Sequence, residues 1–172
     1  MYNFIIAQIF GFFGIIFNVF SMQMKTKKSI MIMLLGLSLS SAFNFLFLNS
    51  ISASLISFFA ALETFINFLF DSKDKKVPIY IIAFYVVVNL ILGFYAYNGI
   101  FDILPIVCSL LFCIIICTKK EKNIKKLTFL NQIFWLIYDI KVKAYMFCMS
   151  NILTLISVIV SLERKEINAK KL

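Results

Sequence analysis

A single carboxylate interrupts one of the most apolar parts of the chain. Glu63 lies within the run Ile51–Phe70, which otherwise contains no charged residue. A helix of that length spans a bilayer, and an acidic residue near its centre costs roughly 2.5–3.5 kcal/mol on insertion scales. Glu63 is therefore a candidate for neutralising a cationic solute or carrying a coupling proton. A carboxyl that holds its proton in an interhelical hydrogen bond is the structural alternative.

Other polar residues recur at helical spacing in the neighbouring apolar runs. Steps of three and four residues place each set on one helix face, and such faces turn toward the bundle interior or a hydrated cavity. Amides can hydrogen-bond a polar solute, and Trp135 with Tyr138 offers a stacking platform for a ring-shaped one. Packing between helices is the alternative role for polar side chains there. The candidate solute ligands are Glu63, Asn44, Asn131, Gln132, Trp135, Tyr138, Asn151 and Thr154.

The residues needed for several other kinds of site are missing from the sequence. There is no histidine, so the usual zinc and haem ligand sets are absent, and the four cysteines lie in apolar segments as small core residues. No Gly-x-Ser-x-Gly elbow, phosphate loop or carboxylate pair on one polar face occurs. Asp102 and Asp139 are expected at the outer ends of helices, in contact with water or headgroups. We therefore expect neither an enzyme nor a resident metal or cofactor.

The composition indicates an integral membrane protein. Of the 172 residues, 62% are hydrophobic, whereas apolar residues make up about 45–50% of soluble domains. Mean hydropathy is +0.98. Seven spans of about 20 residues would use most of the chain, so we expect one transmembrane domain over residues 1–172. The first apolar run lacks a basic leading region and a small-residue cleavage site, which favours a retained helix over a signal peptide.

Hydropathy combined with flanking charge predicts seven transmembrane helices. They are Phe4–Met22, Ile30–Leu48, Ile51–Phe70, Pro78–Tyr97, Phe101–Cys117, Leu127–Ile140 and Tyr145–Leu162, followed by a cytoplasmic tail over residues 163–172. The sixth is short, and its flanking lysines would snorkel to lengthen it. Pro105 is expected inside the fifth helix, where a proline kinks the helix and provides a hinge. Asn89 is expected to hydrogen-bond the fourth helix to a neighbour.

The distribution of positive charge agrees with an odd number of spans. Fifteen of the 17 lysines and arginines follow odd-numbered helices, and only Lys141 and Lys143 lie on the other side. The positive-inside rule then predicts an outer N-terminus and a cytoplasmic C-terminus. The net charge of +9 comes from short lysine clusters, which we expect to contact anionic lipid headgroups rather than nucleic acid.

The first three helices can be laid over the last three with an offset of 91 residues. Phe10 then meets Phe101, and the lengths, charge clusters and loop positions of the two segments also agree. Because one helix separates the repeats, both run in the same direction through the membrane. This predicts parallel triple-helix bundles at residues 4–70 and 101–162, joined by a linker helix at 78–97. A solute site is expected between them at mid-depth.

Four short motifs resemble the YgjV family of bacterial inner-membrane proteins. They are Ala7-Gln8 with Gly11, Asp102-Ile103-Leu104-Pro105, Trp135, and Met149-Ser150-Asn151, and the resemblance runs from about Ile6 to Leu162. It implies a location in the inner (cytoplasmic) membrane. The predicted layout is also similar to the three-plus-one-plus-three bundles of SWEET sugar transporters and PnuC-type vitamin transporters. That similarity implies facilitated movement of a small polar solute.

Two sites carry the similarity to these transporters. Trp135-Leu136-Ile137-Tyr138 is similar to the Trp-x-x-Trp in helix six of PnuC-type proteins, with tyrosine replacing the second tryptophan. Asn151 sits where SWEET-type bundles use an asparagine on the third helix of a triplet. The first triplet departs from that pattern because Ala60 occupies the equivalent place.

We therefore expect an all-α membrane transporter, working by alternating access between two helix triplets. Its solute would be small and polar or ring-containing, such as a sugar or a vitamin precursor, and assembly as a homo-oligomer is left open. The alternative is a non-transporting inner-membrane subunit or sensor. In that case the polar faces hold helices together and the lysine-rich loops dock a partner.

Overall fold

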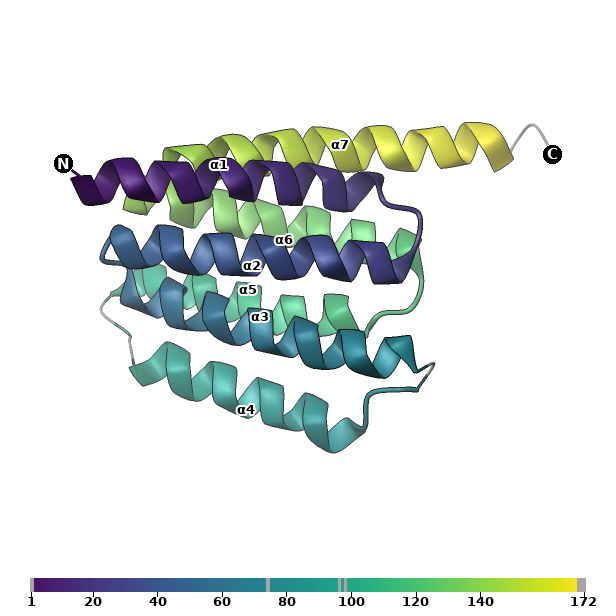
Figure 1. The fold of residues 1–172 in the computed structure, drawn as a ribbon, viewed down its shortest axis with the longest axis horizontal. Coiled ribbons are helices and arrows are strands. Elements are labelled where there is room, and N and C mark those ends of the chain that lie inside the picture. Colours follow the sequence, from purple (N-terminus) through teal and green to yellow (C-terminus); the bar gives the residue numbers. More distant parts are fainter. Residues whose placement is uncertain (1, 74, 96, 98, 170–172) are drawn as a thin grey trace.

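The described part of the chain folds entirely into helices. The computed structural model describes residues 2–73, 75–95, 97 and 99–169, with side chains throughout except at 121 and 161–169. Its elements are α1 (Tyr2–Gln23), α2 (Lys27–Phe47), α3 (Ile51–Ser72), α4 (Ile79–Tyr95), the 3-10 turn η1 (Ile100–Asp102), α5 (Ile103–Cys117), α6 (Glu121–Val142) and α7 (Tyr145–Ala169) (Figure 1). Seven α-helices in this order confirm the predicted number. A helix satisfies its backbone hydrogen bonds internally, which apolar surroundings require.

Four of the described helical segments are long and apolar enough to cross a membrane. They are α1, α2, α3 and the segment Ile100–Cys117. The helix α4 and the part of α7 over Tyr145–Val160 are shorter apolar helices. This pattern is consistent with an integral membrane protein, as the composition predicts.

Several helices extend beyond the boundaries that hydropathy predicts. Helix α2 begins at Lys27 because the Thr26 side chain caps it, accepting a hydrogen bond from Ser29 N at 3.2 Å. Helix α6 begins at Glu121, within the lysine cluster, and α7 continues to Ala169. The predicted tail therefore starts as helix, while residues 170–172 lie outside the described residues. Hydropathy marks where a run becomes apolar, whereas capping decides where a helix begins.

The turns between α2 and α3 and between α6 and α7 are built alike. Each contains a non-glycine residue with left-handed backbone, Asn49 with φ 58° and Lys143 with φ 61°. In each turn the next residue donates its backbone N–H to a carbonyl five residues earlier, at 2.9 Å. This is the hydrogen bond that commonly closes a helix C-terminus. The two left-handed residues lie 94 positions apart, whereas the predicted repeat has an offset of 91 residues.

Six of the helices form a closed ring, and α4 packs outside it. Helices α1, α2, α3, α5, α6 and α7 contact one another in that order, and α7 contacts α1. Helix α4 contacts α3 and α5 and lies at one edge of the bundle (Figure 1). The connections α1–α2, α3–α4 and α5–α6 lie at the same end of the bundle as the C-terminal end of α7 (Figure 1). We call this the lysine-rich end.

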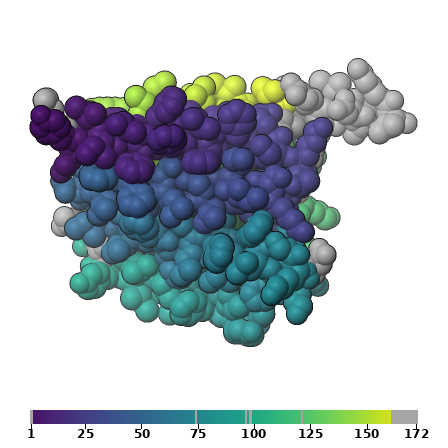
Figure 2. All heavy atoms as spheres, in the orientation of Figure 1, coloured from purple at the N-terminus to yellow at the C-terminus, as the bar shows by residue number. Residues whose placement is uncertain are grey.

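Large apolar side chains cover the outside of the bundle. Figure 2 shows one face of the bundle, formed mainly by α1, α2, α3 and α4. The side chains of Phe12, Phe20, Phe84, Ile91 and Ile156 are each more than half exposed. Many asparagine, serine and threonine side chains are instead buried inside. An apolar outside around a polar inside suits a protein surrounded by lipid.

The close approach of α1 to α7 depends on two glycines. A Cβ built at Gly11 would lie 2.6 Å from Met146 Cβ, and one at Gly14 would lie 2.5 Å from the Phe147 ring. Small residues permit such close packing between membrane helices. A ring can turn aside, but Met146 Cβ is fixed to the backbone. A side chain at Gly11 therefore requires α1 and α7 to separate.

We expect Gly11→Ala to destabilise the protein by about 1–3 kcal/mol, the usual cost of overpacking. The measurement is the melting temperature of the purified protein in detergent. Gly99→Ala is the control, because nothing lies within 4 Å of a Cβ built there. Equal melting temperatures for Gly11→Ala and the wild type would contradict the packing described for α1 and α7.

Pro105 does not interrupt a helix, contrary to the expectation of an interior hinge. It is the third residue of α5 and follows η1 closely. The N–H groups of a first helical turn have no acceptor within the helix, so a proline there removes no hydrogen bond. The structure therefore gives no reason to place a kink in α5 at this residue.

Candidate functional site

A cavity lies inside the ring and is lined by all six of its helices. It offers about 70 Å³ of space for the centres of water molecules. That is room for a handful of waters, since one needs about 10–15 Å³ by this measure. The polar lining residues of α1, α2 and α3 are Asn18, Ser38, Ser41 and Ser57. Those of α5, α6 and α7 are Ser109, Thr128, Asn131, Gln132, Asp139 and Asn151.

Four of the predicted solute ligands meet at this cavity: Asn131, Gln132, Trp135 and Asn151. The first three share one face of α6 because they follow one another at helical spacing. Asn151 comes from α7, which packs beside α6. The structure thus brings these residues together, and their role as solute ligands stays a prediction.

Asp139 is a further residue of α6 at the cavity. It lies in the last turn of the helix, as expected, but the expectation that it meets water or headgroups is corrected by the structure. Its side chain is 1% exposed and lines the cavity. Asn151 Nδ2 donates a hydrogen bond to Asp139 Oδ2 at 2.7 Å, whereas Oδ1 has no partner among the described residues. The spacing that continues from Trp135 to Asp139 is the sequence pattern that could have found it.

Asn18 is a second residue that the sequence analysis missed. It comes from α1 and is buried at the cavity wall. Gln132 Nε2 donates to Asn18 Oδ1 at 3.0 Å, and Asn18 Nδ2 donates to Ser150 Oγ at 3.0 Å. The network joins α6, α1 and α7 across the ring. Because these amide donors are paired within the protein, they hold the cavity wall in shape.

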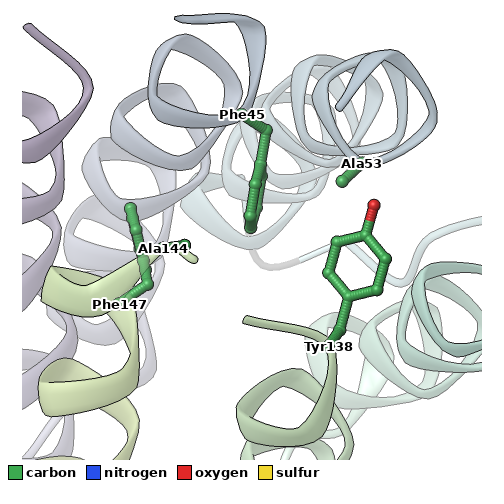
Figure 3. Close-up of a cluster of buried hydrophobic side chains, with 5 residues drawn as sticks. All are labelled: Phe45, Ala53, Tyr138, Ala144 and Phe147. Carbon is green, nitrogen blue, oxygen red and sulfur yellow. The ribbon is translucent and has the colours of Figure 1, made fainter. Parts of the chain in front are cut away.

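An aromatic cluster bounds the cavity away from the lysine-rich end. It consists of Phe45, Trp135, Tyr138 and Phe147, packed with Ala53 and Ala144. Phe45 lies between Phe147 and Tyr138 (Figure 3). Its ring also stacks on Trp135, with centroids 5.5 Å apart and an interplanar angle of 16°. One face of Trp135 is therefore already covered, and a ring-shaped solute would compete with Phe45 for it.

An aliphatic cluster lies on the other side of the cavity. Ile30 and Leu34 of α2 pack there with Ile115 of α5 and Ile124 of α6. These residues occupy the ends of their helices near the lysine-rich end. Most of the polar lining thus lies between an aromatic and an aliphatic cluster, whereas Asp139 lies at the depth of the aromatic cluster.

Three other predicted ligands do not line the cavity. Asn44 Nδ2 donates to Ala7 O at 2.6 Å and so links α2 to α1. The Tyr138 hydroxyl donates to Asp102 Oδ1 at 3.4 Å. Thr154 is fully buried outside the cavity wall. None of these three lines the cavity, although the Tyr138 ring packs edge-on against Trp135.

Asp102 is tied to neighbouring helices rather than left to water or headgroups. Besides Tyr138, Ser52 Oγ donates to Asp102 Oδ1, at 3.0 Å. These bonds connect η1 to α3 and α6. Asp102 lies at the outer end of a helix and is half-buried, as expected, and it also links that end to two neighbouring helices.

Glu63 lies in a different buried polar cluster, where α4 packs against α3 and α5. Asn89 Nδ2 donates to Glu63 Oε1 at 2.6 Å, and Cys113 Sγ lies 3.5 Å from the same oxygen. Asn67 Nδ2 donates to the Tyr85 hydroxyl at 3.3 Å in the same cluster. Glu63 is fully buried but does not line the cavity. This corrects its expected place in the cavity wall and confirms that Asn89 bonds between helices.

Comparison with known proteins identifies the family. A family model described as Imp-YgjV, bacterial inner membrane protein, matches residues 5–168. The chain belongs to the YgjV family. No significant match is found among curated proteins or solved structures. This YgjV-family protein, with its several apolar helices, is thus a multi-pass protein of the bacterial inner membrane.

The cavity of this YgjV-family protein is equipped for hydrogen bonding. Its lining offers amides, hydroxyls and one carboxyl. Among the described residues, no group of three or more histidine, cysteine, aspartate or glutamate side chains gathers to hold a metal ion. What the arrangement can do is bind a small polar molecule reversibly between two apolar clusters.

Proposed function

We propose that this YgjV-family protein is a transporter that moves a small polar solute across the inner membrane by alternating access. The observation that carries the proposal is a polar cavity inside a ring of apolar helices, with an apolar cluster on either side. A solute would enter when one cluster opens and leave when the other opens. Midplane sites between helix repeats are where transporters of this construction hold their solutes.

Equivalent positions in the two halves of the chain support this mechanism. The offset of 91 residues relates five pairs of positions, and all ten residues line the cavity. The pairs are Asn18 with Ser109, Leu37 with Thr128, Ser41 with Gln132, Ile56 with Phe147, and Ala60 with Asn151. Helix α4 lies outside the ring. These relations support two triple-helix units joined by a linker helix, the layout of SWEET-like and PnuC-like transporters.

The lysine-rich end is proposed to face the cytoplasm, with the N-terminus outside. The positive-inside rule supports this orientation. A second cavity lies at this end, with about 300 Å³ of space for water centres, and its lining includes Lys27, Lys75, Lys76 and Lys119. We propose that the lysines there contact anionic lipid headgroups.

The solute is proposed to be small. The cavity as it stands has room for only a handful of waters, so a sugar or vitamin precursor requires it to widen. Separation of Phe45 from Trp135 would provide that space and expose the indole face for stacking. No catalytic step or cofactor is part of the proposed mechanism.

Filling the cavity should stop transport. Ala60 lines it on α3, and in Ala60→Phe the added ring would occupy the space of the solute. We expect uptake into proteoliposomes to fall at least about tenfold, the effect of losing roughly 1.4 kcal/mol of binding. A panel of small amines, amides, sugars and vitamin precursors is first screened by thermal shift, because a ligand raises the melting temperature by mass action. Uptake is then measured with labelled forms of these compounds.

Leu62→Phe is the matched control, because Leu62 lies on the exposed face of the same helix. It should leave both uptake and ligand-induced shifts unchanged. If no member of the panel stabilises or crosses with the wild type, the transporter proposal fails. The non-transporting subunit or sensor would then take its place.

A further inference from the structure

We infer that the central cavity selects a small organic cation, whose N–H groups are bound by Asp139. The inference rests on the proposed transport function and names its class of solute. The role of neutralising a cationic solute, for which Glu63 was the candidate from sequence, is thereby assigned to Asp139.

The unpaired atoms that border the cavity are of one chemical kind. Thr128 Oγ1, Asn131 Oδ1 and Asp139 Oδ1 are buried and have no hydrogen-bond partner among the described residues. All three residues lie on the cavity-lining face of α6. A carboxylate and an amide oxygen only accept hydrogen bonds, and a hydroxyl can accept one. Thr128 and Asp139 are eleven residues apart, or about 16 Å along the helix axis, so a small solute that reaches Asp139 does not also reach Thr128. At Asp139 it must donate hydrogen bonds to the open carboxylate oxygen.

The charge around the cavity favours a cation. Among the described residues that line it, none is lysine or arginine, and Asp139 is the one acid. Asn151 supplies a neutral donor to Asp139 Oδ2 and leaves Oδ1 open. An ionised carboxylate buried without a cation is costly. A cation in the cavity would remove that cost and gain charge-assisted hydrogen bonds, which are the strong ones.

Glu63 does not offer the same site, although it is buried as fully. Asn89 donates to it, Cys113 lies beside it, and it does not line the cavity. Lys141 does not neutralise Asp139 either, because its Nζ lies over the Phe101 ring, 4.9 Å from the centroid. The two acids therefore form a matched pair, one facing the cavity and one set in packed protein.

The test uses three probes of nearly equal shape and different charge, namely acetamidinium, acetamide and acetate. Thermal shift of the purified full-length protein measures their binding. We expect acetamidinium to raise the melting temperature with a saturable dose dependence, and acetamide and acetate to have little effect. Asp139→Asn should weaken acetamidinium binding at least about tenfold, because a charge-assisted hydrogen bond is lost. Glu63→Gln should leave it unchanged.

Two results would overturn the inference. One is an equal shift with acetamide and acetamidinium in the wild type, and the other is undiminished acetamidinium binding by folded Asp139→Asn. In either case neutral solutes would still support the transport proposal, which fails only if no probe or panel solute binds. If Asp139→Asn does not fold, labelling of Cys108 in the wild type by a small thiol reagent takes its place, because Cys108 lines the cavity. We expect acetamidinium to slow this labelling severalfold and to leave Cys113, outside the cavity, unaffected, and unchanged labelling of Cys108 would overturn the inference.

Discussion

Phe45→Ala should open the cavity from the side of the aromatic cluster. Phe45 is 1% exposed and contacts the rings of Trp135, Tyr138 and Phe147. Removing a buried phenylalanine ring costs about 3–5 kcal/mol, so we expect a clear fall in melting temperature. Cys108 lines the cavity, and we also expect it to react with a small thiol reagent at least about ten times faster. A tenfold increase corresponds to lowering the free energy of local opening by roughly 1.4 kcal/mol.

Cys113 is the internal control for this experiment. It lies on the same helix and is also buried, but it contacts Glu63 outside the cavity. Peptide-resolved mass spectrometry reads the two thiols separately in one sample. Faster labelling of both thiols would indicate general unfolding. Unchanged labelling of Cys108 in a folded Phe45→Ala variant would show that Phe45 does not restrict access to the cavity.

Asn89→Leu should loosen α4 from the bundle. Asn89 donates a 2.6 Å hydrogen bond to Glu63, and the described helix α4 contacts only α3 and α5 closely. Leaving a buried polar group without its partner costs about 1–3 kcal/mol, more for a charged one. We therefore expect a loss of at least about 2 kcal/mol, measured as a lower melting temperature.

The double variant Glu63→Leu with Asn89→Leu distinguishes a lost partner from lost packing. Replacing both members of a buried polar pair with apolar groups can be nearly neutral. We expect the double variant to regain most of the stability that Asn89→Leu loses. Additive losses from the two substitutions would instead show that the hydrogen bond between Glu63 and Asn89 contributes little.

Four of the eight solute ligands that local sequence patterns predicted line the cavity. Asn131, Gln132 and Trp135 follow one another at helical spacing, and a polar helix face in a membrane protein turns inward. The same rule applied one turn further would have added Asp139. Asp139 does lie in the last turn of α6, which ends at Val142, and position along the helix alone predicts that it meets water or headgroups. The left-handed turn at Lys143 then brings α7 against α6, and Asn151 of α7 bonds to Asp139.

The place of Glu63 could not be predicted in the same way. Periodicity shows which residues of α3 share a face, but it does not show which helix covers that face. Ala60 lines the cavity, whereas Glu63, one turn later, meets α4 and α5. That difference depends on where α4 packs, which no residue within α3 specifies.

The sequence by itself determined the membrane class, the seven helices, the gathering of lysines at one end and the polar face of α6. Each of these follows from residue type and spacing along one segment. Only the tertiary structure decided that Asp139, rather than Glu63, faces the cavity, and that Phe45 covers Trp135. The physical reason is that a buried acid can be accommodated either in packed protein or beside a cavity. Which of these two places an acid occupies depends on contacts between helices that are far apart in the chain.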